Sequence, residues 1–223
     1  MGAGWWMKTF DRTRWDAIFG GGLPGAEQKI LDALLGEVEG YFDGSDELGP
    51  GPDRERILAS QEGQEAMTLA SHLARNGFTY DGLDRAQSRR LDDFARTICA
   101  PEALGDALDV RWYSPDLLGW GQVSELLDRL GHYRSRRSPR YLPLLLTGRQ
   151  FGTETQPTYA RSGYYAVFSP AETVELRNEV VAAIGVPVPW REPRWEPEGT
   201  QTYFLAPLTE VVKSGRWLHM SYS

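Results

Sequence analysis

The stretch YYAVFSPAETVELRNEVVAAIG, residues 164–185, decides the fold class. Its first part is an apolar, strand-like run that ends at Phe168. The next four residues, SPAE, place Ser169 at a helix N-cap, proline at the first helical position and Glu172 at the third, which makes a full capping box. Apolar residues then recur at helical spacing until Gly185 stops the helix. A strand therefore leads directly into a helix.

The same patterns extend this interpretation to the rest of the chain. They predict strands at 5–10, 110–113, 141–148, 162–168, 200–205 and 216–223, the third of them an edge strand because it contains a proline. They predict the longer helices at 24–42, 54–75, 84–100 and 121–130. Together these elements predict an α+β fold, with a helix-rich N-terminal half and a small mixed β-sheet formed mostly by the C-terminal half.

The length of 223 residues fits one large domain or two small ones. An acidic loop at 43–53 and a basic loop at 132–140 are the weakest points of the pattern. Neither indicates two independent domains, so we expect a single α+β domain over residues 1–223, with a possible weak boundary near 132–140.

Composition and charge indicate which classes of partner the protein can bind. The chain is 41% hydrophobic and 25% charged, which is typical of a globular protein. Its net charge is −7 and its pI is near 5.1. An acidic chain binds nucleic acid and anionic membranes poorly, whereas it suits a basic protein. We therefore expect a protein partner, with no membrane binding and with nucleic acid disfavoured.

The chain contains a single cysteine, Cys99, so no disulfide can form within it and a reducing compartment fits. Residues 1–15 lack the continuous apolar region of a signal peptide, and no apolar run approaches 18 residues. These features predict a cytoplasmic protein.

A glycine cluster, FGGGLPGAEQKIL at residues 19–31, resembles a phosphate-binding loop. Gly20 and Gly25 have the separation found in a Walker loop, but Ala26 and Glu27 stand where that loop requires lysine and a hydroxyl. A carboxylate at this point would repel phosphate. We interpret the cluster as a turn that leads into a helix.

Motifs for metal binding and catalysis are missing from the sequence. The histidines lie far apart, at positions 72, 132 and 219, and a second cysteine is absent. No Gly-x-Ser-x-Gly elbow occurs, and Cys99 lies on an apolar helix face, as a buried structural cysteine would. We expect no metal site, no cofactor and no catalytic residues, which favours a non-enzymatic protein and leaves an enzyme open.

Arginines and tyrosines gather in the third quarter of the chain. Four arginines fall within residues 134–140, and Arg149 and Arg161 follow, the latter between Tyr159 and Tyr164. Arginine beside aromatic rings suits a phosphate, a carboxylate or an unstacked base. A solvated basic loop is the other interpretation of the same pattern.

Eight tryptophans are many for this length. Two of them, Trp190 and Trp195, lie in the proline-rich segment 186–199, where full burial is hard to arrange. Partly exposed aromatic residues are typical of binding surfaces, although such residues also fill cores. We expect Trp190 and Trp195 to contact a partner.

The end of the chain, PLTEVVKSGRWLHMSYS, reads as a helix, a break and a final strand, and the start MGAGWW is a glycine-rich entry into a strand. Together with residues 164–185, this order resembles the small uncharacterised bacterial proteins typified by YfbM. The resemblance covers about a third of the chain. It implies an α+β fold and supplies no catalytic residues.

Two hypotheses for the function follow. The first is a non-enzymatic protein-binding module, immunity- or inhibitor-like, that covers a basic partner. The alternative is an enzyme or sensor that binds a small anionic or phosphate-containing ligand at Arg149, Arg161 and the nearby tyrosines.

Overall fold

The computed structural model describes residues 5–42, 54–99, 104–114, 120–132, 139–152, 164–185 and 200–222. Its contacts divide the chain into two compact units. One, the sheet unit, consists of residues 1–10 and 111–223, and the other, the helical unit, consists of residues 11–110. The divisions between the units fall after Phe10 and after Val110. A single domain with a weak boundary near 132–140 stays a prediction.

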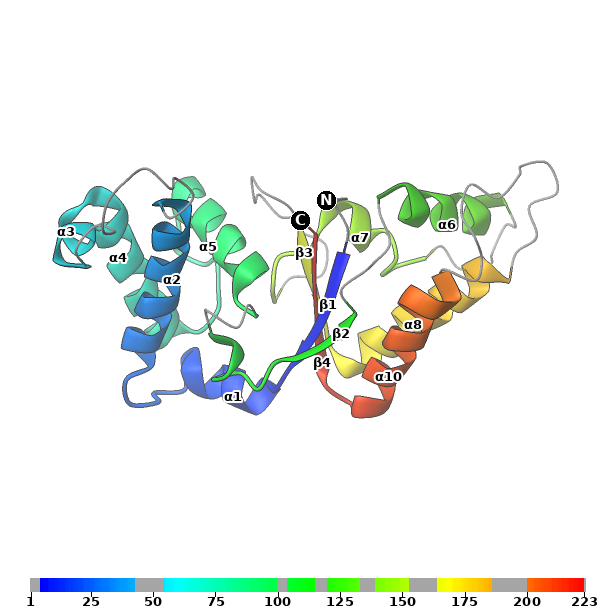
Figure 1. Ribbon diagram of the computed structural model, residues 1–223, viewed down its shortest axis with the longest axis horizontal. Coiled ribbons are helices and arrows are strands. Elements are labelled where there is room, and N and C mark those ends of the chain that lie inside the picture. The colour runs from blue at the N-terminus through cyan, green and yellow to red at the C-terminus, as the bar shows by residue number, and fades with distance from the viewer. Residues whose placement is uncertain are drawn as a thin grey trace. The chain divides into compact units, whose positions relative to one another are not determined.

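The sheet unit is built around four strands: β1 (Trp5–Phe10), β2 (Arg111–Ser114), β3 (Tyr165–Phe168) and β4 (Trp217–Tyr222). Their order is β2-β1-β4-β3, with β1 and β4 in the centre (Figure 1). The α+β class and the contribution of the C-terminal strands are as predicted. All three pairings between the described strands are antiparallel, where a mixed sheet was expected.

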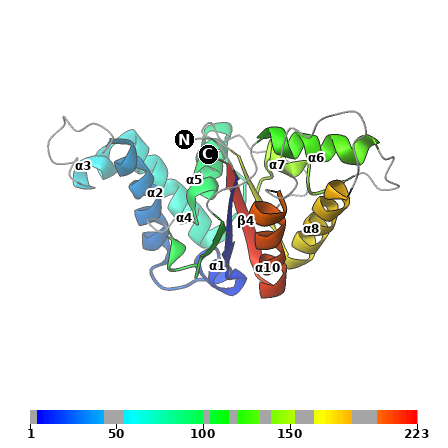
Figure 2. The ribbon, with the colours of Figure 1, turned by 45° about the vertical axis from the view of Figure 1, so that its right-hand side comes forward.

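Helices cover one face of this sheet: α6 (Trp120–His132), α7 (Leu144–Thr147), α8 (Pro170–Ile184) and α10 (Ala206–Ser214). Both views show them on the same side of the strands (Figures 1 and 2). Alternate strand residues such as Met7, Phe168 and Met220 are fully buried in one core with Leu176 and Leu208 of the helices. This core forms because every second side chain of a strand points to the same face of the sheet, and the helices pack their apolar faces against it.

Two predicted strands are helical instead. Residues 144–147 form the short helix α7, which follows Pro143 at a helical φ of −60°. Residues 201–205 form a π-helical segment, η2 (Gln201–Leu205), that runs into α10 and buries Phe204 in the core. In both places apolar or β-prone side chains are buried in the core from a helical turn instead of a strand. Over so few residues, the periodicity of the sequence does not distinguish the two conformations.

The helical unit contains α1 (Arg12–Ile18), α2 (Ala26–Phe42), α3 (Arg54–Ala59), α4 (Gln61–Asn76) and α5 (Arg85–Thr97). Figure 1 shows α2, α4 and α5 grouped together. Their buried faces include Ile30, Leu73 and Phe94, each fully inaccessible to solvent. Trp15, in the middle of α1, contributes to this core and makes a ring contact with Phe78 at a centroid distance of 5.0 Å.

The glycine cluster has a packing role in this unit. Gly20 has φ +80°, and a Cβ built on it would lie 2.9 Å from the backbone nitrogen of Gly77. Gly77 itself ends α4, and its N–H donates to the carbonyl of Leu73. The turn at residues 19–25 therefore passes close to the end of α4, at a distance that a side chain would not allow.

Candidate functional site

The six residues predicted to bind a ligand or partner fall into two groups. Arg149 and Tyr164 lie within the described residues. The other four lie outside them: Tyr159, Arg161, Trp190 and Trp195. The structure therefore places two members of the arginine–tyrosine cluster.

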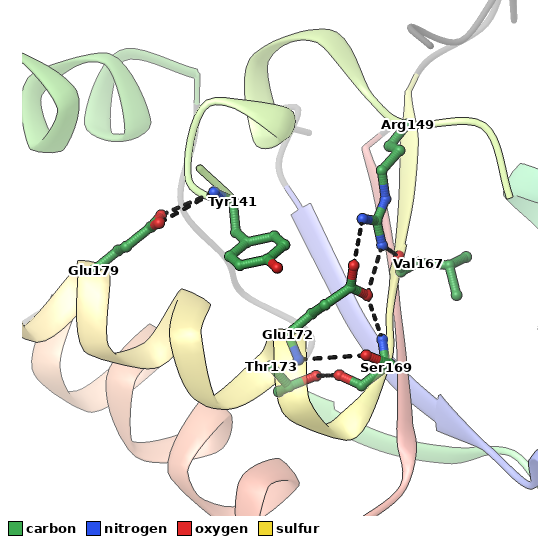
Figure 3. A network of polar contacts seen from close by, with 7 residues as sticks. All are labelled: Tyr141, Arg149, Val167, Ser169, Glu172, Thr173 and Glu179. Carbon is green, nitrogen blue, oxygen red and sulfur yellow. Dashed lines mark hydrogen bonds and ion pairs between the residues drawn. The ribbon is translucent and has the colours of Figure 1, made fainter. Parts of the chain in front are cut away.

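Arg149 is buried, with 6% of its surface exposed. Its backbone N–H donates to the carbonyl of Tyr165, 2.7 Å away, which fixes it beside β3. The guanidinium makes a two-pronged contact with Glu172, with Nη1–Oε1 and Nη2–Oε2 distances of 2.8 and 3.0 Å (Figure 3). Nη2 also donates to the carbonyl of Val167. This buried cation is thus held by the chain's own carboxylate and backbone.

Glu172 links the N-terminus of α8 to the segment that contains Arg149. Besides Arg149, its Oε2 accepts the N–H of Ser169 at 2.8 Å, which completes the predicted capping box of α8. Burial by itself would raise the pKa of the Glu172 carboxyl. The hydrogen bonds from Arg149 and Ser169 and the charge of Arg149 outweigh burial and hold the pKa below its ordinary value.

A second glutamate of α8 anchors the other end of the segment that contains Arg149. The carboxylate of Glu179 accepts the backbone N–H groups of Arg140, Tyr141 and Leu142 at 2.6, 3.0 and 2.7 Å. Figure 3 shows its contact with Tyr141. Glu172 and Glu179 are seven residues apart, so they lie on the same side of α8. Arg140, the last arginine of the predicted basic loop, is therefore attached to α8 through its backbone.

Tyr164 has different neighbours from Arg149. Its ring lies 6.4 Å from that of Tyr222, and its carbonyl accepts the N–H of Tyr222 at 2.8 Å. It packs, partly buried, against the core of the sheet unit. Arg149 instead lies over the ring of Phe168 at 5.0 Å. The two predicted site residues thus lie against different rings, Tyr222 and Phe168.

A set of polar residues that no sequence motif predicted lies on the face of the sheet opposite the helices. Lys8 and His219 stand opposite each other on β1 and β4, and both are buried. The His219 ring stacks on Tyr165 at 6.2 Å, and the Tyr165 hydroxyl accepts the N–H of Phe151. Ammonium, imidazole and phenol groups can hold an anion or transfer a proton. The signal for this set in the sequence was one polar residue, Lys8 or His219, within each of two predicted strands.

The described tryptophans differ sharply in exposure. Trp5 and Trp15 are buried and Trp6 and Trp217 are partly buried. Trp112 on β2 is 47% exposed. Among the tryptophans whose side chains the structure describes, Trp112 is therefore the best placed to meet a partner, and no pattern in the sequence distinguished it from the others.

No cluster of metal-ligating side chains occurs among the described residues. Cys99 is buried, as its apolar surroundings in the sequence predicted. His72 is partly buried, with its Nε2 3.2 Å from the carbonyl of Thr79 and its Nδ1 3.1 Å from Asn76. The two described histidine side chains, His72 and His219, belong to different units.

Comparison of the chain with models of protein families, with curated proteins and with solved structures found no match. The resemblance to the YfbM family stays a prediction. Within the part of the chain that the structure describes, no helix combines the length and apolar character needed to cross a bilayer.

Proposed function

We propose that this protein is a non-enzymatic, cytoplasmic protein-binding module that covers a basic partner, in the manner of an immunity or inhibitor protein. The observation that carries the proposal is the distribution of charge between the two units. Residues 11–110 contain twenty Asp and Glu against ten Lys and Arg, whereas the rest of the chain contains eleven against fourteen. The negative charge of the protein is therefore concentrated on the helical unit.

Part of this charge is available at the surface. Glu27, Glu62 and Asp81 are exposed, and none of them makes an ion pair with another described residue. A surface of one sign speeds the encounter with a partner of the opposite sign and disfavours partners of the same sign. The single buried cysteine is consistent with a reducing compartment.

The alternative is a small anionic ligand bound by Arg149, Arg161, Tyr159 and Tyr164. It has less support, because the guanidinium of Arg149 already donates to Glu172 and Val167. A ligand there would have to displace a carboxylate that is part of a helix cap.

The first test is capture of partners by the tagged full-length protein from a lysate of its source cells, with and without nuclease. We expect one stoichiometric basic protein that survives nuclease. The triple variant E27Q/E62Q/D81N should then associate about tenfold more slowly, and raising the salt concentration should remove most of this difference. Stopped-flow kinetics with the purified partner measure both effects.

The matched control is D128N/E175Q/E210Q, which neutralises three exposed carboxylates of the sheet unit. It should associate at nearly the wild-type rate. An acidic partner, or equal association rates for the wild type and both variants, would rule out the proposal. W190A and W195A test separately whether those two residues contact the partner, since an unchanged affinity would remove them from the interface.

A further inference from the structure

Strand β2 is an edge of the sheet. It pairs with β1 on its inner side and has no neighbour on its outer side among the strands that the structure describes. An open edge presents backbone donors and acceptors to which another extended chain can bind. In the middle of this edge strand stands Trp112, about half exposed.

The ring of Trp112 is held in place by two neighbours. The ammonium of Lys8 lies 4.1 Å from its centroid, which is within the range of a cation–π contact. The ring of Trp6 meets it edge-on at 5.9 Å and 82°. An aromatic side chain that is already fixed loses little conformational freedom on binding, which is typical of residues that dominate an interface.

The surroundings of this edge are cationic. Arg111 is exposed on β2 and stands opposite Thr9 of β1. The hydroxyl of Thr9 accepts from Nε of Arg216, 3.2 Å away, so a second guanidinium lies on the same side of the sheet. Strands β1, β2 and β4 contain no acidic residue. Arg111 and Arg216 lie on the face of Thr9, and the buried Lys8 lies with Trp112 on the opposite face, so the edge has cations on both faces of the sheet. These charges favour a negatively charged ligand at the edge.

We propose that the outer edge of β2 binds a short, extended, acidic segment of a partner protein, which adds to the sheet as a further strand and packs an apolar side chain on Trp112. This inference goes beyond the proposed function, since it assigns a second surface, of opposite charge, to the other unit. The register shift between Met7 and Lys8 interrupts the β1–β2 pairing, so the added strand is short. Contact with Trp112 then supplies much of the affinity.

The test starts from a random library of ten-residue peptides displayed on phage and selected on the immobilised full-length protein. We expect the selected peptides to be rich in Asp and Glu and to contain β-branched or aromatic residues. A selected peptide should bind W112A at least tenfold more weakly than the wild type. W112F should retain most of the affinity, which separates loss of the ring from loss of folding.

The matched control is Y203A, which removes an exposed aromatic ring elsewhere in the sheet unit and should leave binding unchanged. Methylation of alternate backbone nitrogens in the peptide should abolish binding, because strand addition needs those N–H groups. Basic peptides, or acidic peptides that bind W112A as well as the wild type, would overturn the proposal.

Two further measurements separate this inference from other possibilities. E27Q/E62Q/D81N should bind the acidic peptide like the wild type, even if that variant fails to bind a basic partner. A single-stranded oligonucleotide is the competing ligand, since bases also stack on tryptophan beside cations. If the oligonucleotide binds in a Trp112-dependent way and no acidic peptide is selected, the edge recognises nucleic acid and the proposal is wrong.

Discussion

The side chain of Glu172 takes part in both a helix cap and an ion pair. It caps its own helix through Ser169 and at the same time pairs with Arg149, a residue 23 positions earlier in the chain. The first contact is local and follows from the SPAE pattern. The second requires the segment before β3 to lie against the start of α8, so it depends on the folded sheet unit.

The substitution E172Q separates these two contacts, because glutamine at the third helical position can still complete a capping box. It removes the negative charge beside the buried guanidinium of Arg149. We expect the free energy of unfolding to fall by about 1–3 kcal/mol at neutral pH, in the range of hydrogen bonds to charged groups. Urea unfolding measures this change, and E175Q, an exposed glutamate on the same helix, is the control.

The pH dependence follows from the lowered pKa of Glu172. A carboxyl whose pKa is lower in the folded state adds stability that is fully present above its unfolded pKa and disappears as the pH falls through the folded pKa. The stability difference between the wild type and E172Q should therefore stay constant from pH 7 to about pH 5 and shrink below the ordinary value of 4.5. A difference that grows on acidification would contradict the assignment.

At the scale of elements, the junction between α3 and α4 depends on two small residues. The sequence predicted one helix over 54–75, and the structure ends α3 at Ala59 and begins α4 at Gln61. Ser60 caps α4, with its hydroxyl accepting the N–H of Gly63 at 3.2 Å. Gly63 also allows the preceding turn to pack closely, since a Cβ there would lie 2.0 Å from the carbonyl oxygen of Ile57.

The substitution G63A should therefore destabilise the helical unit by about 1–3 kcal/mol, because backbone atoms must move to accommodate the methyl group. Gly36, exposed on α2, has no neighbour within 4 Å of an added Cβ. G36A should stabilise the protein by about 0.5–1 kcal/mol through the better helix propensity of alanine. Thermal and urea unfolding of G63A and G36A compare the same chemical change in two helices. An equal change in the free energy of unfolding for both variants would show that the contact with Ile57 is unimportant.

At the scale of the whole molecule, the helical unit is an insertion between two neighbouring strands. The chain leaves the sheet unit after β1 and returns at β2, which pairs with β1. The N–H of Asp11 donates to the carbonyl of Leu108 at 2.9 Å, so the two ends of the helical unit are close together. Inserted segments with adjacent ends often fold on their own.

We expect residues 11–110, expressed alone, to give a helical circular dichroism spectrum and a cooperative urea transition. The remaining residues should also fold when a short linker containing Asn-Gly joins Phe10 to Arg111, because β1 and β2 then form a hairpin. Thr9 and Arg111, which already face each other, set the register of this hairpin. If neither polypeptide shows a cooperative transition, the two units do not fold independently.

Local patterns in the sequence were enough to predict the elements with clear caps or clear strand patterns. The N-cap at Ser169 and the strand at 5–10 are formed as predicted, because each depends on residues that are close together in the chain. The same reasoning failed at 141–148 and 200–205. Those segments are short, and burial of their apolar side chains in the core decides their conformation.

The sequence by itself determined the α+β class, the capping box at the start of α8, the burial of Cys99 and the acidic charge of the protein. Only the tertiary structure decided that Arg149 is paired with Glu172, that Lys8 faces His219 across two strands, and that Trp112 stands on an open edge. The physical reason is the range of the interactions. Caps and periodicity depend on neighbours in the chain, whereas these pairs join residues that only the packing of distant strands and helices brings together.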